Sequence, residues 1–341
     1  MKLFIKKITL LVLLPFVVYA AIVIYWDPFK VFFSYDDYYT NNPVTGNRED
    51  ICLKLLNKHP RATAINNFII GSSRSQAFKT NEWAKRMKAK NDQTFFHYDG
   101  SSLGLYRSKN AINYLSEHSK KINTILWIID PDFFGELQNP SGHLFIQPPA
   151  VSHENKWLYY FKFVLAAMDF HFVMSNVVYY LDGKTYHDFM GFYIGKSKYY
   201  HTCKNLTADI YYSYDKDIAK DSTGYYQNLL KKGVFYKRPI APIVSKQLIN
   251  EEQLILLQQI KEIKRSKKFQ LKIVISPLYN QIKFNPKDLQ SLENIFGKEN
   301  IYDFSGKNVY TNDFRNYYES SHFKPYIANQ ILDAIYSENI H

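Results

Sequence analysis

The chain has 341 residues, of which 46% are hydrophobic, and a formal net charge of +12 at pH 7. It is long enough to bury one large core or two small ones. The charge comes mostly from lysine, with neither zinc-finger spacing nor an aromatic RNA motif, so nucleic acid is a poor candidate partner. A basic surface suits anionic lipid head groups or acidic glycans, and it is equally typical of plain solvation. We expect neither a metal site nor a cofactor.

The first segment favours a membrane anchor. Ile8–Trp26 is 19 residues without a charge, which is enough to cross about 30 Å of hydrocarbon. Three lysines within residues 1–7 favour a cytoplasmic N-terminus, so that everything after Trp26 lies outside the cell membrane. A cleaved signal peptide is the alternative because of Tyr19–Ala21, but the apolar run continues through Ile24, unlike a cleavage region.

Beyond a juxtamembrane connector at residues 27–63, the chain alternates between strand-like and helix-like segments. The expected strands are Phe68–Ile70, Thr94–Tyr98, Ile122–Ile129, Gln270–Ile275 and Ile301–Phe304. The expected helices are Gln76–Lys88, Tyr106–His118, Glu251–Lys267, Pro286–Phe296 and Ile327–Ser337. Five such units predict an α/β domain at residues 64–341, a three-layer α/β/α sandwich with a mainly parallel, flavodoxin-like five-stranded sheet.

One long insertion interrupts this alternation. Residues 138–245 are rich in Tyr, Phe, Pro and Lys, with short helices expected at Lys156–Phe170 and Phe172–Leu181. The insertion follows the third strand, so its ends should lie at the carboxyl edge of the sheet, where ligands of such folds bind. It is expected to act either as a lid that carries the substrate or as an independently packed subdomain.

The first strand ends in the polar motif Gly71-Ser72-Ser73-Arg74-Ser75. A serine lifted out at a strand end is suited to nucleophilic attack if a base lies within hydrogen-bonding reach, and its own backbone N–H can donate to an oxyanion. Ser73 is the candidate nucleophile. The alternatives are a serine that caps the following helix and a turn that binds an anion such as phosphate.

A second polar motif, Glu319-Ser320-Ser321-His322, precedes the last helix. A carboxylate three residues before a histidine can supply a general base and the group that orients it from one tight loop. We expect His322 to be the base and Glu319 its orienting acid, with Asp313 as the reserve candidate. An ordinary surface histidine is the alternative.

The order and content of these motifs resemble the SGNH (GDSL-type) hydrolase superfamily. Its Gly-Asp-Ser block corresponds to Gly71-Ser72-Ser73, and its Asp-x-x-His block to Glu319–His322. The resemblance covers roughly residues 64–135 and 250–341 together with the anchor. It is closest in kind to membrane-anchored members such as alginate O-acetylation and lipoteichoic-acid D-alanylation proteins. For those, the resemblance implies acyl transfer beside a membrane-bound O-acyltransferase partner.

The chain departs from the family pattern in two places. The orienting acid is Glu rather than Asp, and the Asn block that completes the oxyanion hole is missing where the chain reads His97–Gly104. We expect the oxyanion donors to be the backbone N–H groups of Ser73 and Gly100, with Ser101 or Ser102 as the third. Gly100 and Gly104 are equally compatible with ordinary turns.

Three further groups of residues complete the sequence prediction. Arg74 follows the nucleophile and would pair either with an anionic group of the substrate or with a structural carboxylate. Asp130 and Asp132 end the third strand and are expected to form a turn beneath the site. Cys52 and Cys203 fit either a single disulfide or two independent thiols.

The sequence therefore predicts a membrane-anchored, extracytoplasmic serine acyl-esterase or O-acyltransferase. It would act on acyl groups of cell-surface glycan through an acyl-serine intermediate. The acyl group would pass either to a sugar hydroxyl, as in a transferase, or to water, as in an esterase. The alternative is a catalytically inactive SGNH-fold protein that binds glycan or serves as a scaffold for a membrane O-acyltransferase.

Overall fold

The computed structural model describes residues 2–39, 43–191, 193–194, 200–202, 207–212 and 214–337. Of the two cysteines, Cys203 lies outside the described residues. Cys52 is a buried free thiol, and burial raises its pKa to about 12. A thiol of this kind is inert at neutral pH because so little of it is thiolate.

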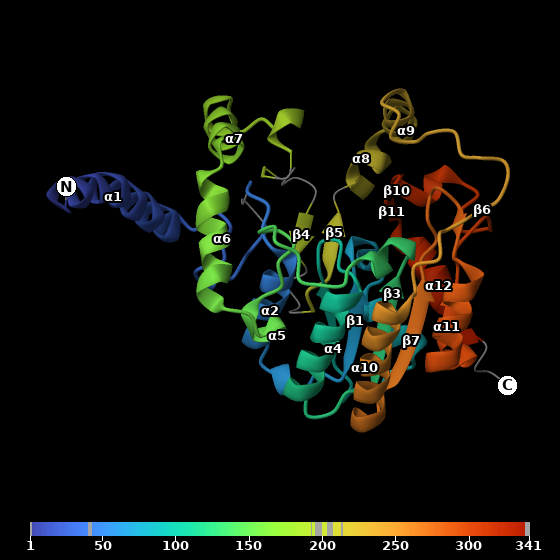
Figure 1. The fold of residues 1–341 in the computed structure, drawn as a ribbon. Coiled ribbons are helices and arrows are strands. Elements are labelled where there is room, and N and C mark those ends of the chain that lie inside the picture. The colour runs from blue at the N-terminus through green and yellow to red at the C-terminus, as the bar shows by residue number, and fades with distance from the viewer. Residues whose placement is uncertain are drawn as a thin grey trace.

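The centre of the molecule is a five-stranded parallel sheet (Figure 1). Its strands in chain order are β1 (Asn67–Gly71), β2 (Phe95–Asp99), β3 (Thr124–Ile129), β7 (Gln270–Ile275) and β9 (Ile301–Asp303). They lie side by side in the order β2-β1-β3-β7-β9, and every neighbouring pair is parallel. This is the 2-1-3-4-5 order of flavodoxin-like sheets, whose chain changes direction between the first and third strands. The predicted parallel α/β fold is confirmed.

Helices cover both faces of the sheet. One face packs against α2 (Arg48–Lys58), α4 (Leu105–His118), α10 (Glu251–Lys267) and α11 (Pro286–Phe296), and the other against α3 (Thr80–Arg86) and α12 (Pro325–Ser337). Side chains alternate along each strand, so that Phe68 and Ile70 enter the first core and Ile69 enters the second. All six residues of β3 are buried, as expected of a central strand covered on both faces.

The region after Ser73 and the connector differ from the sequence prediction. The single helix expected at Gln76–Lys88 is instead the short 3₁₀ helix η2 (Ser73–Ala77) followed by α3. The two are separate because Phe78 and Lys79 have extended backbone angles, with ψ of 127° and 137°. The connector at 27–63 contains α2, whose N-terminus is capped by Asn47.

In its described residues, the insertion contains five α-helices, the 3₁₀ helix η4 (Asp188–Met190) and a small two-stranded sheet. The α-helices and strands are α5 (Pro149–Ser152), α6 (Lys156–Met168), α7 (Phe170–Leu181), β4 (Tyr200–Thr202), β5 (Ile210–Tyr212), α8 (Tyr214–Lys220) and α9 (Ser222–Lys231). Helices α6 and α7 meet at Asp169, two residues before the predicted break, because the Asp169 side chain accepts the first N–H groups of α7. The end of the insertion, β6 (Ile243–Val244), pairs with β8 (Ile282–Lys283) in the main domain.

The N-terminal helix α1 (Lys2–Trp26) packs against α6. Within the described residues, no single helix has both the length and the hydropathy of a membrane span, and α1 holds only the shorter apolar stretch Leu13–Trp26. Helices α6 and α7 satisfy the length and composition of a span only as a pair, which is bent by 59°.

Candidate active site

Ser73 lies at the carboxyl end of β1, where the chain turns sharply into η2. The Ser72 carbonyl oxygen accepts the Ser75 N–H at 2.9 Å and the Ser75 hydroxyl at 2.7 Å, which closes the turn. A Cβ at Gly71 would lie 2.8 Å from the Ser75 Cβ and 2.9 Å from the Ile128 carbonyl oxygen. The turn therefore requires glycine before the two serines, and it leaves Ser73, the first residue of η2, partly exposed.

Glu319 and His322 lie on a small antiparallel hairpin formed by β10 (Tyr317–Glu319) and β11 (His322–Phe323). The Nδ1–H of His322 donates to one carboxylate oxygen of Glu319, and the other oxygen accepts the Ser321 N–H at 2.8 Å. With Nδ1 bonded in this way, Nε2 is the nitrogen that can accept a proton. That Nε2 is buried and has no hydrogen-bond partner among the described residues.

The surroundings of Glu319 keep it ionised. Burial raises the pKa of its carboxyl group, but the hydrogen bond and charge of His322 and the N–H of Ser321 outweigh burial, so the pKa is below its ordinary value. A carboxylate of this kind can hold the imidazole in one tautomer and stabilise the imidazolium that forms when Nε2 takes up a proton.

The two motifs lie next to each other in the structure. β11, which begins at His322, packs against η2, which begins at Ser73. The Phe78 and Phe323 rings meet edge to face at 5.9 Å between centroids and fix this contact. Glu319 is close enough to Arg74 to help raise the pKa of its guanidinium. Residues almost 250 positions apart in the sequence are thus brought to one edge of the sheet.

The expected oxyanion donor Gly100 is engaged elsewhere. Its N–H donates to the Gly71 carbonyl oxygen at 3.2 Å and extends the pairing of β1 with β2. A Cβ at Gly100 would lie 2.7 Å from the Glu49 Cγ, so the glycine makes room for a buried carboxylate rather than for a substrate. The prediction for Gly100 is therefore corrected: its N–H is not available as an oxyanion donor here.

The loop that follows Gly100 is held by a buried arginine that the sequence reading missed. Arg107 donates to the carbonyl oxygens of Ser101 and Ser102 at 3.1 and 2.5 Å, and it pairs with Glu49 at 2.8 Å and Glu136 at 2.7 Å. The network places Ser101 at the end of β2, the strand next to β1. An arginine at the start of an amphipathic helix gives no sequence signal for this role.

Arg74 is paired with a structural carboxylate. Its Nη1 donates to Asp130 at 2.5 Å, and Asp130 also accepts the Asp132 N–H at 3.1 Å as the N-cap of the 3₁₀ helix η3 (Pro131–Gly135). Burial lowers the pKa of Arg74, but the neighbouring carboxylates, Asp130 foremost, outweigh burial and raise it above its ordinary value. Of the two alternatives for Arg74, the structural ion pair is the one observed, and the expected turn at Asp130 is confirmed.

A second serine, histidine and aspartate set lies beneath the first. The Ser75 hydroxyl is 2.9 Å from Nε2 of His97, and Nδ1 of His97 is 3.3 Å from Asp209. All three side chains are at most 2% exposed, and the Ser75 hydroxyl already donates to Ser72. Because no substrate carbonyl can approach a group this deeply buried, we interpret the set as a support of the Ser73 turn.

The insertion places tyrosines beside His322. The Tyr212 ring lies 5.8 Å from the His322 ring, and the Tyr212 hydroxyl donates to Gln76 of η2. Tyr225 donates to the Tyr318 carbonyl oxygen at 2.8 Å, and Tyr318 donates to Asp215 at 2.6 Å. The insertion therefore contacts both motif loops, and its aromatic rings form one side of the candidate site.

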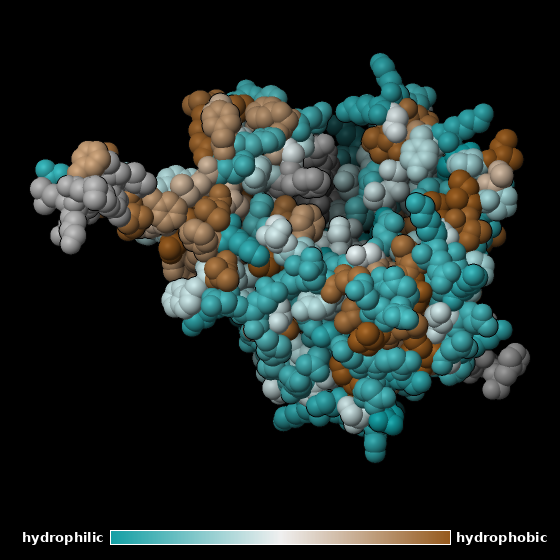
Figure 2. Space-filling model, in the orientation of Figure 1, coloured by the Kyte–Doolittle hydropathy of each residue, from teal (hydrophilic) through white to brown (hydrophobic). Residues whose placement is uncertain are grey.

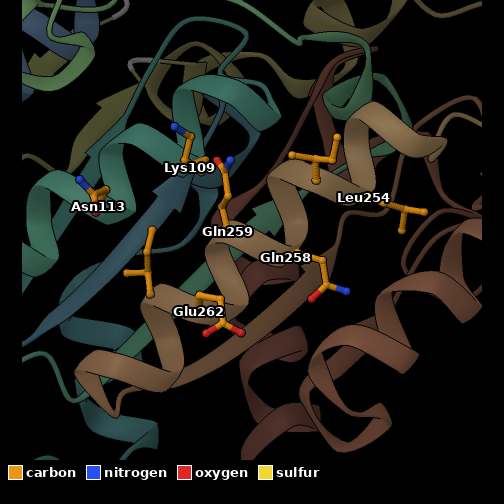
Figure 3. Close-up of a pocket in the computed structure, with 8 residues that line it drawn as sticks. Lys109, Asn113, Leu254, Gln258, Gln259 and Glu262 are labelled. Carbon is orange, nitrogen blue, oxygen red and sulfur yellow. The ribbon is translucent and has the colours of Figure 1, made fainter.

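A surface groove lies elsewhere, away from the candidate site (Figure 3). It has a volume of about 730 Å³ and runs between α4 and α10, lined by Lys109, Asn113, Leu254, Ile255, Gln258, Gln259, Glu262 and Ile263. None of these residues comes from the loops that carry Ser73, Glu319 or His322. Across the described ranges, no group of three or more His, Cys, Asp or Glu side chains is arranged to hold a metal ion.

Comparison of the chain with models of known protein families finds no match, and comparison with curated proteins finds none either. The functional interpretation therefore rests on the residues themselves. Those residues are a serine at the switch point of a parallel sheet and a histidine and glutamate pair beside it.

Proposed function

We propose that this protein is a membrane-anchored, extracytoplasmic serine acyl-esterase or O-acyltransferase of the SGNH type, acting on acyl groups of cell-surface glycan. One observation carries the proposal. The Nε2 of His322 is buried, has no hydrogen-bond partner within the described ranges and belongs to an imidazole oriented by Glu319, on a hairpin packed against the turn of Ser73. A serine nucleophile needs such a base within hydrogen-bonding reach, and the reaction requires the Ser73 hydroxyl to turn towards this Nε2, because no hydrogen bond joins the two among the described residues.

In the proposed reaction, the Ser73 hydroxyl oxygen attacks the carbonyl carbon of an acyl ester while Nε2 of His322 takes up the hydroxyl proton. The charge of Glu319 stabilises the resulting imidazolium. The tetrahedral intermediate collapses, the ester bond to the leaving alcohol breaks, and His322 returns the proton to that alcohol. The acyl group is now an ester of Ser73.

The second half of the reaction is the reverse with a new acceptor. A sugar hydroxyl or water gives its proton to His322 and attacks the acyl-serine carbonyl carbon, and the proton then returns to the Ser73 oxygen. The Ser73 backbone N–H is the first oxyanion donor, and Ser101 is the candidate for the second because its loop ends the neighbouring strand. Exclusion of water by the insertion would favour transfer over hydrolysis.

The remaining parts of the proposal have separate support. The uncharged run Ile8–Trp26 supports the anchor. The tyrosines of the insertion beside His322 support a sugar acceptor, since aromatic faces suit pyranose rings. The resemblance to membrane-anchored SGNH proteins supports a membrane-bound O-acyltransferase as the partner that supplies or receives the acyl group.

Turnover of an aryl acetate ester by the purified full-length protein tests the proposal. Wild type should hydrolyse the ester, and Ser73→Ala and His322→Ala should each retain the folded melting temperature and lose the activity. Addition of an oligosaccharide acceptor should divert acetyl groups from water to sugar. Absence of ester turnover in folded wild-type protein would contradict the proposed enzymatic activity.

A specific observation favours a second candidate function. The Gly100 N–H is occupied by Gly71, so the oxyanion hole expected of the family is incomplete at that position. A catalytically inactive protein that binds glycan, or that serves as a scaffold for a membrane O-acyltransferase, would account for this. Glycan binding without ester turnover in folded wild type is the result that this candidate predicts.

A further inference from the structure

The outer faces of α6 and α7 carry an unusual density of exposed apolar side chains. Five large apolar residues on α6 and six on α7 are exposed, the most prominent being Trp157 at 72%, Leu158 at 62%, Phe170 at 78% and Leu181 at 83%. Figure 2 shows apolar residues gathered over these helices, whereas much of the α/β domain in the same view is polar. Monomeric soluble proteins rarely expose an apolar face of this extent.

The inner faces of the same helices are packed in a core of their own. Buried residues of α6 and α7 meet Val23 of α1 and Phe29 and Val31 of the connector. Phe29 contacts the rings of Phe163 on α6 and Phe172 on α7, at 5.7 and 5.0 Å between centroids. The inner faces of the two helices are therefore packed against α1 and the connector, and large apolar side chains remain on their outer faces. A helix with large apolar side chains on its outer face as well as its inner face needs an apolar environment on the outer side too.

The exposed face is continuous with α1. Phe16 of α1 contacts Phe161 of α6 at 6.2 Å between centroids, the Tyr19 hydroxyl donates to the Ala167 carbonyl oxygen at 2.5 Å, and Trp26 lies 6.3 Å from Phe172. In Figure 1, α1 points away from the rest of the molecule, and α6 and α7 run roughly across its direction. The apolar face thus lies where α1 leaves the domain.

We propose that the outer face of α6 and α7 lies in the lipid bilayer interface, as a second membrane contact beside α1. This inference rests on the membrane-anchored part of the proposed function. The helices have 13 and 12 residues, or roughly 18–20 Å each, too short to cross about 30 Å of hydrocarbon singly. Bent by 59° and packed against α1 and the connector by their inner faces, they lie along the membrane surface.

The chemistry of the face fits lipid. Lys156, Lys162 and Asp169 are the only Lys, Arg, Asp or Glu residues between positions 156 and 181. Trp157 and Tyr180 lie near the two ends of the pair, and Lys156 stands over the Trp157 ring at 5.2 Å. Tryptophan and tyrosine favour the level of the head groups, where lysine meets anionic lipid. Both contacts together would fix the orientation of the site of Ser73 relative to the membrane.

Tryptophan quenching in vesicles tests the inference with the full-length protein. The chain has four tryptophans, and Trp83 and Trp127 are fully buried. In Trp26→Phe protein, reconstituted in vesicles of phosphatidylcholine and phosphatidylglycerol, the emission of Trp157 reports on α6. The Trp157 emission is obtained by subtracting the spectrum of the Trp26→Phe/Trp157→Phe protein from that of the Trp26→Phe protein. Brominated acyl chains should remove most of it, and aqueous acrylamide should not.

The matched control carries Val309→Trp in the Trp26→Phe/Trp157→Phe background. Val309 is 76% exposed, in the loop after β9, so its tryptophan should respond to acrylamide and not to brominated lipid. A Trp157 emission that behaves in the same way would overturn the inference. Shielding of Trp157 from both quenchers in a dimeric protein would overturn it too, because a second copy would then cover the face.

The anchor is measured separately in Trp157→Phe protein, where Trp26 reports on α1. If brominated lipid quenches Trp26 but not Trp157, the anchor stands and the second contact is wrong. If the protein does not sediment with vesicles at all, both are wrong. Turnover of ester is independent of either result.

Discussion

The imidazole of His322 is hydrogen-bonded through Nδ1 to the carboxylate of Glu319, across the two-residue turn that joins β10 to β11. The bond is local in sequence, but a role for it in catalysis depends on the packing of this hairpin against η2, where Ser73 lies. Because Nε2 is left without a partner among the described residues, the pair has the form of a base prepared for a proton.

If Ser73 and His322 act as one catalytic unit, the losses of turnover caused by replacing each of them should not multiply. Ser73→Ala and His322→Ala should each lower ester turnover by roughly 10⁴–10⁶-fold with little change in melting temperature, and the double variant should be scarcely worse than either single one. Steady-state kinetics of the three variants provide the measurement. Losses that multiply would mean that the two residues do not share a mechanism.

Glu319→Gln keeps the size of the side chain but removes its charge. The amide no longer holds a single imidazole tautomer or stabilises the imidazolium, so turnover should fall. The loss should be about 10²-fold smaller than the loss in His322→Ala. Asp313→Asn is the matched control, since the Asp313 side chain accepts the Arg315 N–H at 2.8 Å as a cap. A larger loss in Asp313→Asn than in Glu319→Gln would assign the orienting role to Asp313.

The turn of Ser73 should not tolerate a side chain at Gly71. An alanine there would bring its Cβ to 2.8–2.9 Å from Ser75 and Ile128, and we expect a loss of about 1–3 kcal/mol in the free energy of unfolding. Ester turnover should fall as well, because Ser73 is displaced. Gly135→Ala is the control, since its Cβ would meet nothing within 4 Å. Equal melting temperatures for the two variants would refute this account of the turn.

The five strands of the sheet could be predicted from sequence to within two residues at either end. β1 and β3 are nearly continuous apolar runs, as buried parallel strands require, and β2, β7 and β9 are short runs rich in aromatic and branched residues. The region after Ser73 was less predictable. The pattern over Gln76–Lys88 predicts a single helix, but extended angles at Phe78 and Lys79 separate η2 from α3. Those angles depend on tertiary contacts such as that of Phe78 with Phe323.

The site could be predicted only in part, because some of its contacts are local in sequence and others depend on the folded chain. Glu319 and His322 are three residues apart, so their bond is a local property that a motif can express. The role of Gly100 was predicted wrongly because its neighbour Glu49 lies 51 positions away in the sequence. The His97 and Asp209 pair was missed because Asp209 belongs to the insertion, and only the folded chain brings it beneath Ser75.

Stability should depend on pH through His143. Its ring lies 4.9 Å from Phe29 and 5.7 Å from Tyr193, and burial lowers its pKa from 6.5 to about 4, against the opposing charge of Asp169. Between these two values the unfolded chain binds a proton that the folded chain does not. The free energy of unfolding should therefore fall as pH falls through this range, by up to about 1.4 kcal/mol per pH unit.

His143→Leu removes that titration and keeps the site apolar. Thermal melting of wild type and variant over a pH series measures the stability of wild type relative to the variant, which should fall as pH falls below the ordinary histidine pKa. Identical pH slopes in the two proteins would show that His143 does not titrate as its burial implies.

The most direct measurement is the site of covalent modification by a fluorophosphonate serine probe, mapped by mass spectrometry on the intact full-length protein. The account predicts phosphonylation of Ser73, its loss in Ser73→Ala and His322→Ala, and its persistence in Ser75→Ala, even though the last variant leaves His97 without its serine partner at a cost of about 1–3 kcal/mol. Modification of Ser75, or no modification of the folded wild-type protein, would contradict it.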